Sequence, residues 1–201
     1  MAAKLKYSSG IKDFPLLYLE MKKTAQLLLE GKTDAEILSL STVQNIFQLD
    51  KEKRRKSMPY KTLTRLHELS VELIAVIAHG SDENARLISF YGLVKTDILL
   101  FEFMRDVFHD KYLSGQTIIA DSDFIVFLNC KANESEYIAG WKPEMLRQIK
   151  NTYKKVLCEA GLAKRQGEEI LVIKPLMNNE LKGMFARGDV FAETMLLEVG
   201  Q

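Results

Sequence analysis

Residues 84–113 constrain the fold more than any other stretch, because they carry the densest run of large apolar side chains at helical spacing. Apolar positions recur at steps of three and four, and further aromatic and aliphatic residues widen the stripe until it nearly encircles the helix. A membrane span would need about 20 nearly uninterrupted apolar residues, whereas charged residues such as Lys95 and Glu102 interrupt this stretch. We therefore predict a core helix, either continuous or broken near Thr96 and Asp97.

The composition favours one compact, water-soluble domain. The chain has 201 residues, of which 47% are hydrophobic, and this length suffices for one substantial core. Its 28 basic and 27 acidic residues give a net charge of +1, so any binding of nucleic acid must depend on local charge. Cys130 and Cys158 lack a CxxC pair or a histidine at ligand spacing, and no apolar segment of signal-peptide length begins the chain. We expect a reduced, cytoplasmic protein.

A basic segment over residues 50–65 is the first candidate functional surface. A predicted helix over residues 14–30, a glycine turn and a second helix with a capping box of Thr33 and Glu36 precede it. Its seven basic residues, against two acidic ones, are Lys51, Lys53, Arg54, Arg55, Lys56, Lys61 and Arg65. This is the order of helix-turn-helix modules, in which a positive helix meets DNA, but a solvated helix face is the alternative interpretation. Pro59 predicts that the helix either restarts or kinks there.

A second basic surface is predicted near the C-terminus. A helix over residues 142–160 places apolar side chains on one face and cations and amides on the other: Arg147, Gln148, Lys150, Asn151, Lys154 and Lys155. The following segment predicts a hairpin of two strands around Gln166 and Gly167, tipped with Lys164 and Arg165. Helix, turn, basic helix and hairpin follow one another in the order of a winged helix.

The predicted architecture is mainly all-α and compact, with two helix-turn-helix-like motifs and a small C-terminal β-hairpin. Within a single domain over residues 1–201, we expect a helix-turn-helix-like lobe over 14–69, core helices over 70–115, a winged-helix-like lobe over 121–175 and C-terminal helices over 178–199.

The sequence contains no recognisable catalytic motif. A glycine-rich phosphate loop, a nucleophile elbow, a Cys–His–acid spacing and a metal-ligand cluster are all missing from it. Asp121 and Asp123 precede an apolar helical pattern, and no third ligand follows at Ca²⁺-loop spacing, so we interpret them as helix caps. We expect no catalytic residues, no metal and no cofactor.

Three sequence blocks resemble a known family. FEFMRDVFHDKYLSG, DSDFIVFL and LRQIKNTYKKVLCEAGL look like successive blocks of the BrxA family of bacteriophage exclusion (BREX) phage-defence systems. The resemblance extends weakly back through LLYLEMKKTAQLLLEG and the basic segment, and it depends on the series because no single block is a chemical signature. It implies an all-helical, non-enzymatic protein with two helix-turn-helix motifs that binds double-stranded DNA. Pro59 falls where the family pattern suggests an unbroken basic helix.

Two functional hypotheses remain open. In the first, the protein binds duplex DNA, mainly through phosphate contacts from the two basic surfaces and the hairpin. In the second, it is an adaptor that docks another BREX component, such as the methyltransferase, ATPase or phosphatase-like protein that the resemblance implies. The basic faces would then be solvated or paired with an acidic partner. In both cases we expect a monomer without a membrane segment.

Overall fold

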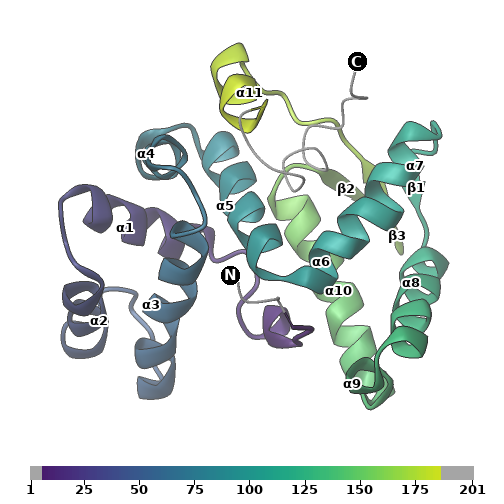
Figure 1. Ribbon diagram of the computed structural model, residues 1–201, viewed down its shortest axis with the longest axis horizontal. Coiled ribbons are helices and arrows are strands. Elements are labelled where there is room, and N and C mark those ends of the chain that lie inside the picture. The colour runs from purple at the N-terminus through teal and green to yellow at the C-terminus, as the bar shows by residue number, and fades with distance from the viewer. Residues whose placement is uncertain (1–5, 187–201) are drawn as a thin grey trace. The chain divides into compact units, whose positions relative to one another are not determined.

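The computed structural model describes residues 6–186, and its internal contacts divide the chain into two units (Figure 1). The first, which we term the N-terminal unit, is Leu16–Thr96. The second, the C-terminal unit, combines Met1–Pro15 with Asp97–Gln201. Both are mainly helical and one carries a small antiparallel sheet, which confirms the predicted fold class. The single domain and its predicted lobes stay predictions.

The N-terminal unit consists of α1 (Tyr18–Leu29), α2 (Asp34–Val43), α3 (Glu52–Leu66), α4 (Val71–His79) and α5 (Asp82–Thr96). The predicted capping box is confirmed: the Glu36 N–H donates to Thr33 Oγ1 at 3.3 Å, and the Thr33 N–H donates to Glu36 Oε2 at 2.8 Å. Residues 87–94 of α5 are all buried. A Cβ at Gly92 would lie 3.2 Å from the Arg65 carbonyl oxygen, so glycine lets α3 approach α5 closely.

Pro59 lies inside a continuous α3, which begins at Glu52. The alternative of a helix that begins at Pro59 is therefore wrong. Proline has no N–H to donate to the carbonyl four residues earlier, which belongs to Arg55. The Ser41 hydroxyl of α2 donates to that carbonyl instead, at 2.6 Å, and the Ser41 side chain is buried. The neighbouring helix thus supplies the hydrogen bond that proline removes.

The apolar stretch over residues 84–113 is broken at Thr96 and Asp97, one of the two predicted alternatives. The Asp97 carboxylate accepts the Leu100 N–H at 3.0 Å and so caps α6 (Ile98–Phe103). The helical path continues as a π-helical segment, η2 (Met104–His109), and ends in α7 (Asp110–Leu113). Because the boundary between the units falls at this break, α5 serves the N-terminal core and α6 serves the C-terminal core.

The C-terminal unit adds η1 (Gly10–Lys12), β1 (Ile118–Ile119), α8 (Asp121–Glu134), α9 (Glu136–Ala139), α10 (Pro143–Glu159), β2 (Ala163–Gln166), β3 (Glu169–Val172) and α11 (Asn179–Ala186). Its core is built around Phe103 of α6. The Phe103 ring stacks on Phe124 with centroids 4.8 Å apart, and its centroid lies 5.3 Å from those of Phe127 and Tyr153. These aromatic contacts join α6, α8 and α10.

The predicted hairpin is present, and it belongs to a three-stranded antiparallel sheet of order β1-β3-β2. Ile119 of β1 pairs with Ile170 of β3, so a third strand, which the sequence did not predict, joins the hairpin. A strand of only two residues is too short for a recognisable alternating pattern. Gln166 pairs with Glu169, so the turn lies at residues 167–168, and Lys164 and Arg165 lie within β2 rather than at the tip.

The first predicted C-terminal helix corresponds to α11, whereas residues 187–199 lie outside the described residues. Within residues 6–186, every helix is too short or too polar to cross a lipid bilayer.

The contact between Ser41 and the Arg55 carbonyl generates a prediction for a double-mutant cycle. Ser41→Ala should lower the free energy of unfolding by ~1–3 kcal/mol, because it leaves a buried carbonyl unpaired. In a Pro59→Ala background the same change should cost much less, since the new backbone N–H at position 59 can donate to Arg55. Urea unfolding of the four proteins gives the coupling. Equal costs of Ser41→Ala in both backgrounds would contradict this account of Pro59.

Candidate nucleic-acid interface

The basic segment around α3 divides into exposed and structural cations. Arg65 is only 4% exposed and donates to the Leu16 carbonyl at 3.1 Å, so its charge is used inside the N-terminal unit. Arg55 is half-buried, and its Nε donates to the Leu49 carbonyl at 2.7 Å, which fixes the loop before α3. The remaining cations are exposed and form what we term the first basic surface: Lys51, Lys53, Arg54, Lys56 and Lys61.

The first basic surface includes an aromatic residue that the charge pattern did not reveal. Tyr60 is 59% exposed and follows Lys53 and Lys56 at helical steps of three and four, so the three side chains share one face. A tyrosine hydroxyl can donate to a phosphate oxygen. Lys56 pairs with Glu52 at 2.6 Å, but both side chains are well exposed, so this ion pair contributes little stability.

The second predicted surface is corrected at Lys150 and Lys154. Lys154 was expected on an exposed face of α10 but is only 1% exposed. Its Nζ contacts Asp121 Oδ1 at 2.5 Å and donates to the Glu168 carbonyl in the hairpin turn. Lys150 Nζ contacts the other oxygen of Asp121, also at 2.5 Å, and its side chain is only 16% exposed. Both cations turn toward the start of α8 rather than toward solvent.

Asp121 is the common partner of these two lysines. Hydrogen bonds from Lys150 and then Lys154 hold the pKa of Asp121 below its ordinary value, although partial burial opposes the shift. Of the two aspartates that were predicted to cap α8, only Asp123 does so: its carboxylate accepts the Ala120 N–H at 2.7 Å. The capping interpretation is therefore confirmed for Asp123 alone. The residues that the structure describes contain no group of side chains arranged to hold a metal ion.

The second basic surface, as the structure defines it, consists of exposed side chains of α10 and β2: Arg147, Gln148, Asn151, Lys155, Lys164 and Arg165. Gln148, Asn151 and Lys155 form one row at steps of three and four. Arg147 pairs with Glu144 at 2.8 Å, with both side chains more than half exposed. Because β2 is an edge strand, its two cations also discourage pairing with another strand.

Comparisons with known proteins identify the family. The family model for BrxA matches residues 5–189 of this chain. The chain belongs to the BrxA family. It is 40% identical to the BREX protein BrxA of Bacillus cereus (strain H3081.97) over 172 residues, and this aligned region covers 86% of each chain. The resemblance seen in the sequence blocks is confirmed.

The fold is similar to that of a solved structure. It is the crystal structure of an uncharacterized protein from Magnetospirillum magneticum, with a TM-score of 0.79 and 20% sequence identity. The match covers 96% of this chain and 99% of that chain. At this identity, the likeness concerns the fold alone.

The environment of Lys154 generates a stability prediction. Asp121→Asn removes the carboxylate that compensates a buried ammonium group, so it should lower the free energy of unfolding by ~3–5 kcal/mol at neutral pH. Glu144→Gln is the matched control, because it breaks an exposed ion pair that contributes about 1 kcal/mol or less. Urea unfolding at pH 7 compares the variants. Equal stability of Asp121→Asn and the parent would contradict the structural role of the contact between Asp121 and Lys154.

The lowered pKa of Asp121 also fixes the sign of its pH dependence. The stabilisation is complete above the pKa of the unfolded state, which is about 3.9 for an aspartate, and is lost as pH falls through the lower folded-state pKa. The difference in the free energy of unfolding between Asp121→Asn and the parent should therefore shrink as the pH falls below the pKa of the unfolded state. A difference that stays constant through this range would assign the destabilisation to something other than the charge.

Proposed function

We propose that this BrxA-family protein is a non-enzymatic component of a BREX phage-defence system that binds double-stranded DNA through phosphate contacts. The observation that carries the proposal is the clustering of exposed cations on the first and second basic surfaces of a chain whose net charge is only +1. Phosphate contacts supply affinity without regard to base sequence. We therefore expect a dissociation constant on the order of micromolar at physiological salt, with little sequence preference.

The order of elements in the C-terminal unit supports this proposal. Strand β1 is followed by α8, α9 and α10 and then by the β2–β3 hairpin, which pairs back onto β1. This order is that of a winged helix, in which the last helix before the hairpin enters the major groove. On that model, the exposed amides of Gln148 and Asn151 would face base edges, and the flanking cations would contact phosphates.

Asp121, Lys150 and Lys154 have a part in this model without direct DNA contact. Lys154 joins α10 to the hairpin turn through the Glu168 carbonyl and to α8 through Asp121. It therefore holds the basic helix and the hairpin in one arrangement. We exclude Lys154 and Arg65 from the proposed contacts because both are buried, and we treat Lys150 and Arg55 as positioning residues.

Charge reversal separates the two functional hypotheses. Lys53→Glu with Arg54→Glu should weaken binding to every duplex tested, and so should Lys155→Glu with Arg165→Glu. Each phosphate contact contributes a slope of about −0.9 in log affinity against log salt, so each lost contact should flatten the slope by about one unit. Gel-shift titration of unrelated duplexes at several salt concentrations measures both quantities.

The control is Lys32→Glu, an exposed lysine in the turn between α1 and α2 that belongs to neither surface. It should leave both affinity and salt slope close to those of the parent. Combining all four reversals should nearly abolish binding while the helical circular-dichroism signal persists. If that folded protein binds DNA as well as the parent, DNA binding is excluded, and the basic surfaces belong to a protein partner.

A further inference from the structure

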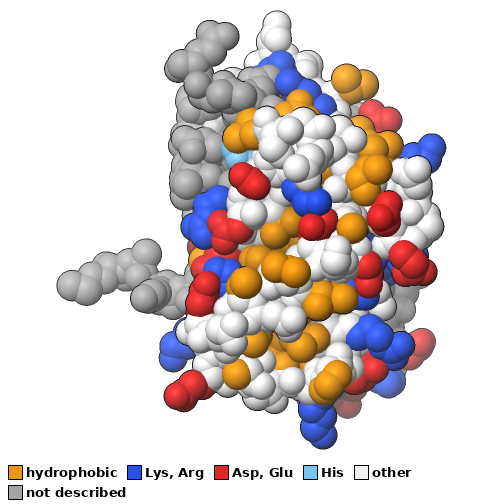
Figure 2. Space-filling view, turned by 90° about the vertical axis from the view of Figure 1, so that its right-hand side faces the viewer, with side chains coloured by type: hydrophobic (Ala, Val, Ile, Leu, Met, Phe, Trp, Pro, Cys, Tyr) orange, Lys and Arg blue, Asp and Glu red, His pale blue; other side chains and the backbone are white. Residues whose placement is uncertain are grey.

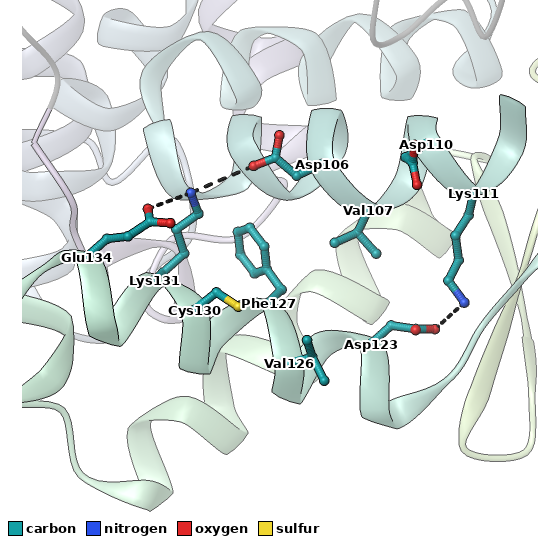
Figure 3. A pocket seen from close by; sticks show the side chains of 10 residues that line it. All are labelled: Asp106, Val107, Asp110, Lys111, Asp123, Val126, Phe127, Cys130, Lys131 and Glu134. Atoms are coloured by element: carbon teal, nitrogen blue, oxygen red, sulfur yellow. Dashed lines mark hydrogen bonds and ion pairs between the residues drawn. The ribbon is translucent and has the colours of Figure 1, made fainter. Parts of the chain in front are cut away.

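An open groove of about 370 Å³ lies between η2 and α7 on one side and α8 on the other (Figure 3). Its apolar lining comes from Val107 of η2 and from Val126, Phe127 and Cys130 of α8. Charged side chains surround this lining: Asp106, Asp110, Lys111, Asp123, Lys131 and Glu134. All of these residues belong to the C-terminal unit, and none belongs to either basic surface.

The two lysines of the groove are already neutralised. Lys131 Nζ lies 2.9 Å from Glu134 and 3.1 Å from Glu102, and Lys111 Nζ lies 2.6 Å from Asp123. Burial lowers the pKa of Lys131, but the hydrogen bonds to Glu134 and Glu102 outweigh it and raise the pKa to about 12. Lys131 is thus charged at neutral pH and surrounded by carboxylates, which oppose the approach of an anionic ligand.

The groove therefore has an excess of negative charge. Four carboxylates line it against two lysines, and Arg105, which is not part of the lining, pairs with one of the four, Asp106. Asp110 is exposed, and its carboxylate makes no ion pair within the described part of the chain. Phosphates of DNA would be repelled here, whereas a cationic group would gain a partner.

Apolar surface extends from the groove over the outer face of α8. Val126 is 60% exposed inside the groove, and Ile125 is 47% exposed beside it. Between Asp123 and Glu134, all residues exposed on this face are uncharged: Ile125, Val126, Asn129, Cys130 and Asn133. Figure 2 shows apolar side chains gathered across this side of the molecule with charged groups between and around them. A face of this kind is typical of a protein-binding surface.

We propose that this groove docks a basic amphipathic segment of another component of the same BREX system. An aliphatic side chain of the partner would cover Val107, Val126 and Phe127, and its lysine or arginine residues would pair with Asp110 and Glu134. A simple polyamine would leave the apolar surface at Ile125 uncovered. Residues 187–201 of this chain carry Asp189, Glu193 and Glu198 against Arg187, so their charge does not complement the groove.

The experiment uses Cys130 as a reporter, because it is exposed in the groove and the chain contains only one other cysteine. In a Cys158→Ser background, the rate of alkylation of Cys130 is measured with and without each of the other BREX components, purified singly. A component that occupies the groove should slow alkylation. Raising the salt concentration should restore the rate, because the contacts at the rim are electrostatic.

Affinity measurements identify the contact surface. Val126→Lys places a cation in the groove and should weaken binding of that component by about tenfold or more, as expected for a central contact. Val43→Lys is the matched control, because Val43 is 79% exposed on α2 in the other unit, and it should have no effect. Asp110→Lys reverses charge at the rim and should also weaken binding. None of the three should change the affinity for DNA, so this result is independent of the proposed function.

Several outcomes would overturn the proposal. The proposal fails if no BREX component slows the alkylation of Cys130. It also fails if the component that slows it binds the Val126→Lys variant as tightly as it binds the parent protein. Protection of Cys130 that rises with the concentration of this protein alone would assign the groove to a second copy. Protection by duplex DNA alone would assign it to nucleic acid.

Discussion

The arrangement of the C-terminal unit depends on the contacts that the buried ammonium group of Lys154 makes with Asp121 and with the Glu168 carbonyl. A lysine only 1% exposed is costly to bury unless its charge is compensated and its hydrogen bonds are satisfied. Asp121 at the start of α8 and the Glu168 carbonyl in the hairpin turn meet both requirements. These two partners must keep their positions relative to α10 for the charge to remain tolerable. The position of the hairpin beside the basic helix is therefore coupled to the stability of the unit.

Arg65 shows the same use of a cation in the N-terminal unit, where its guanidinium donates to the Leu16 carbonyl before α1. In both units, then, a run of basic residues contains members that fold the protein and members that face solvent. A local sum of charge cannot distinguish them, because the same side chain can serve either purpose. Burial and hydrogen-bond partners decide, and they leave two smaller basic surfaces than the sequence suggested.

Features that depend on neighbouring residues were predictable from the sequence. The Thr33 and Glu36 capping box and the β2–β3 hairpin each follow from spacing within a few residues, whereas the break at Asp97 was one of two alternatives that the sequence left open. Features that depend on distant partners were not. The compensation of Pro59 by Ser41 links α3 to α2, and the inward orientation of Lys154 depends on Asp121, 33 residues earlier. Strand β1 exists because β3 pairs with it, and two residues alone carry no pattern.

The first turn of α8 explains how one small unit can present surfaces of opposite charge. Asp121 faces α10 and binds Lys150 and Lys154, so these two side chains turn inward and do not extend the second basic surface. Two residues later, Asp123 pairs with Lys111 across the groove, so the positive charge of Lys111 is compensated there. Exposed cations therefore remain along α10 and β2, and the exposed carboxylates of Asp110 and Glu134 remain at the groove. A net charge of +1 therefore conceals local surfaces of opposite charge, because the near-neutral total is a sum over both.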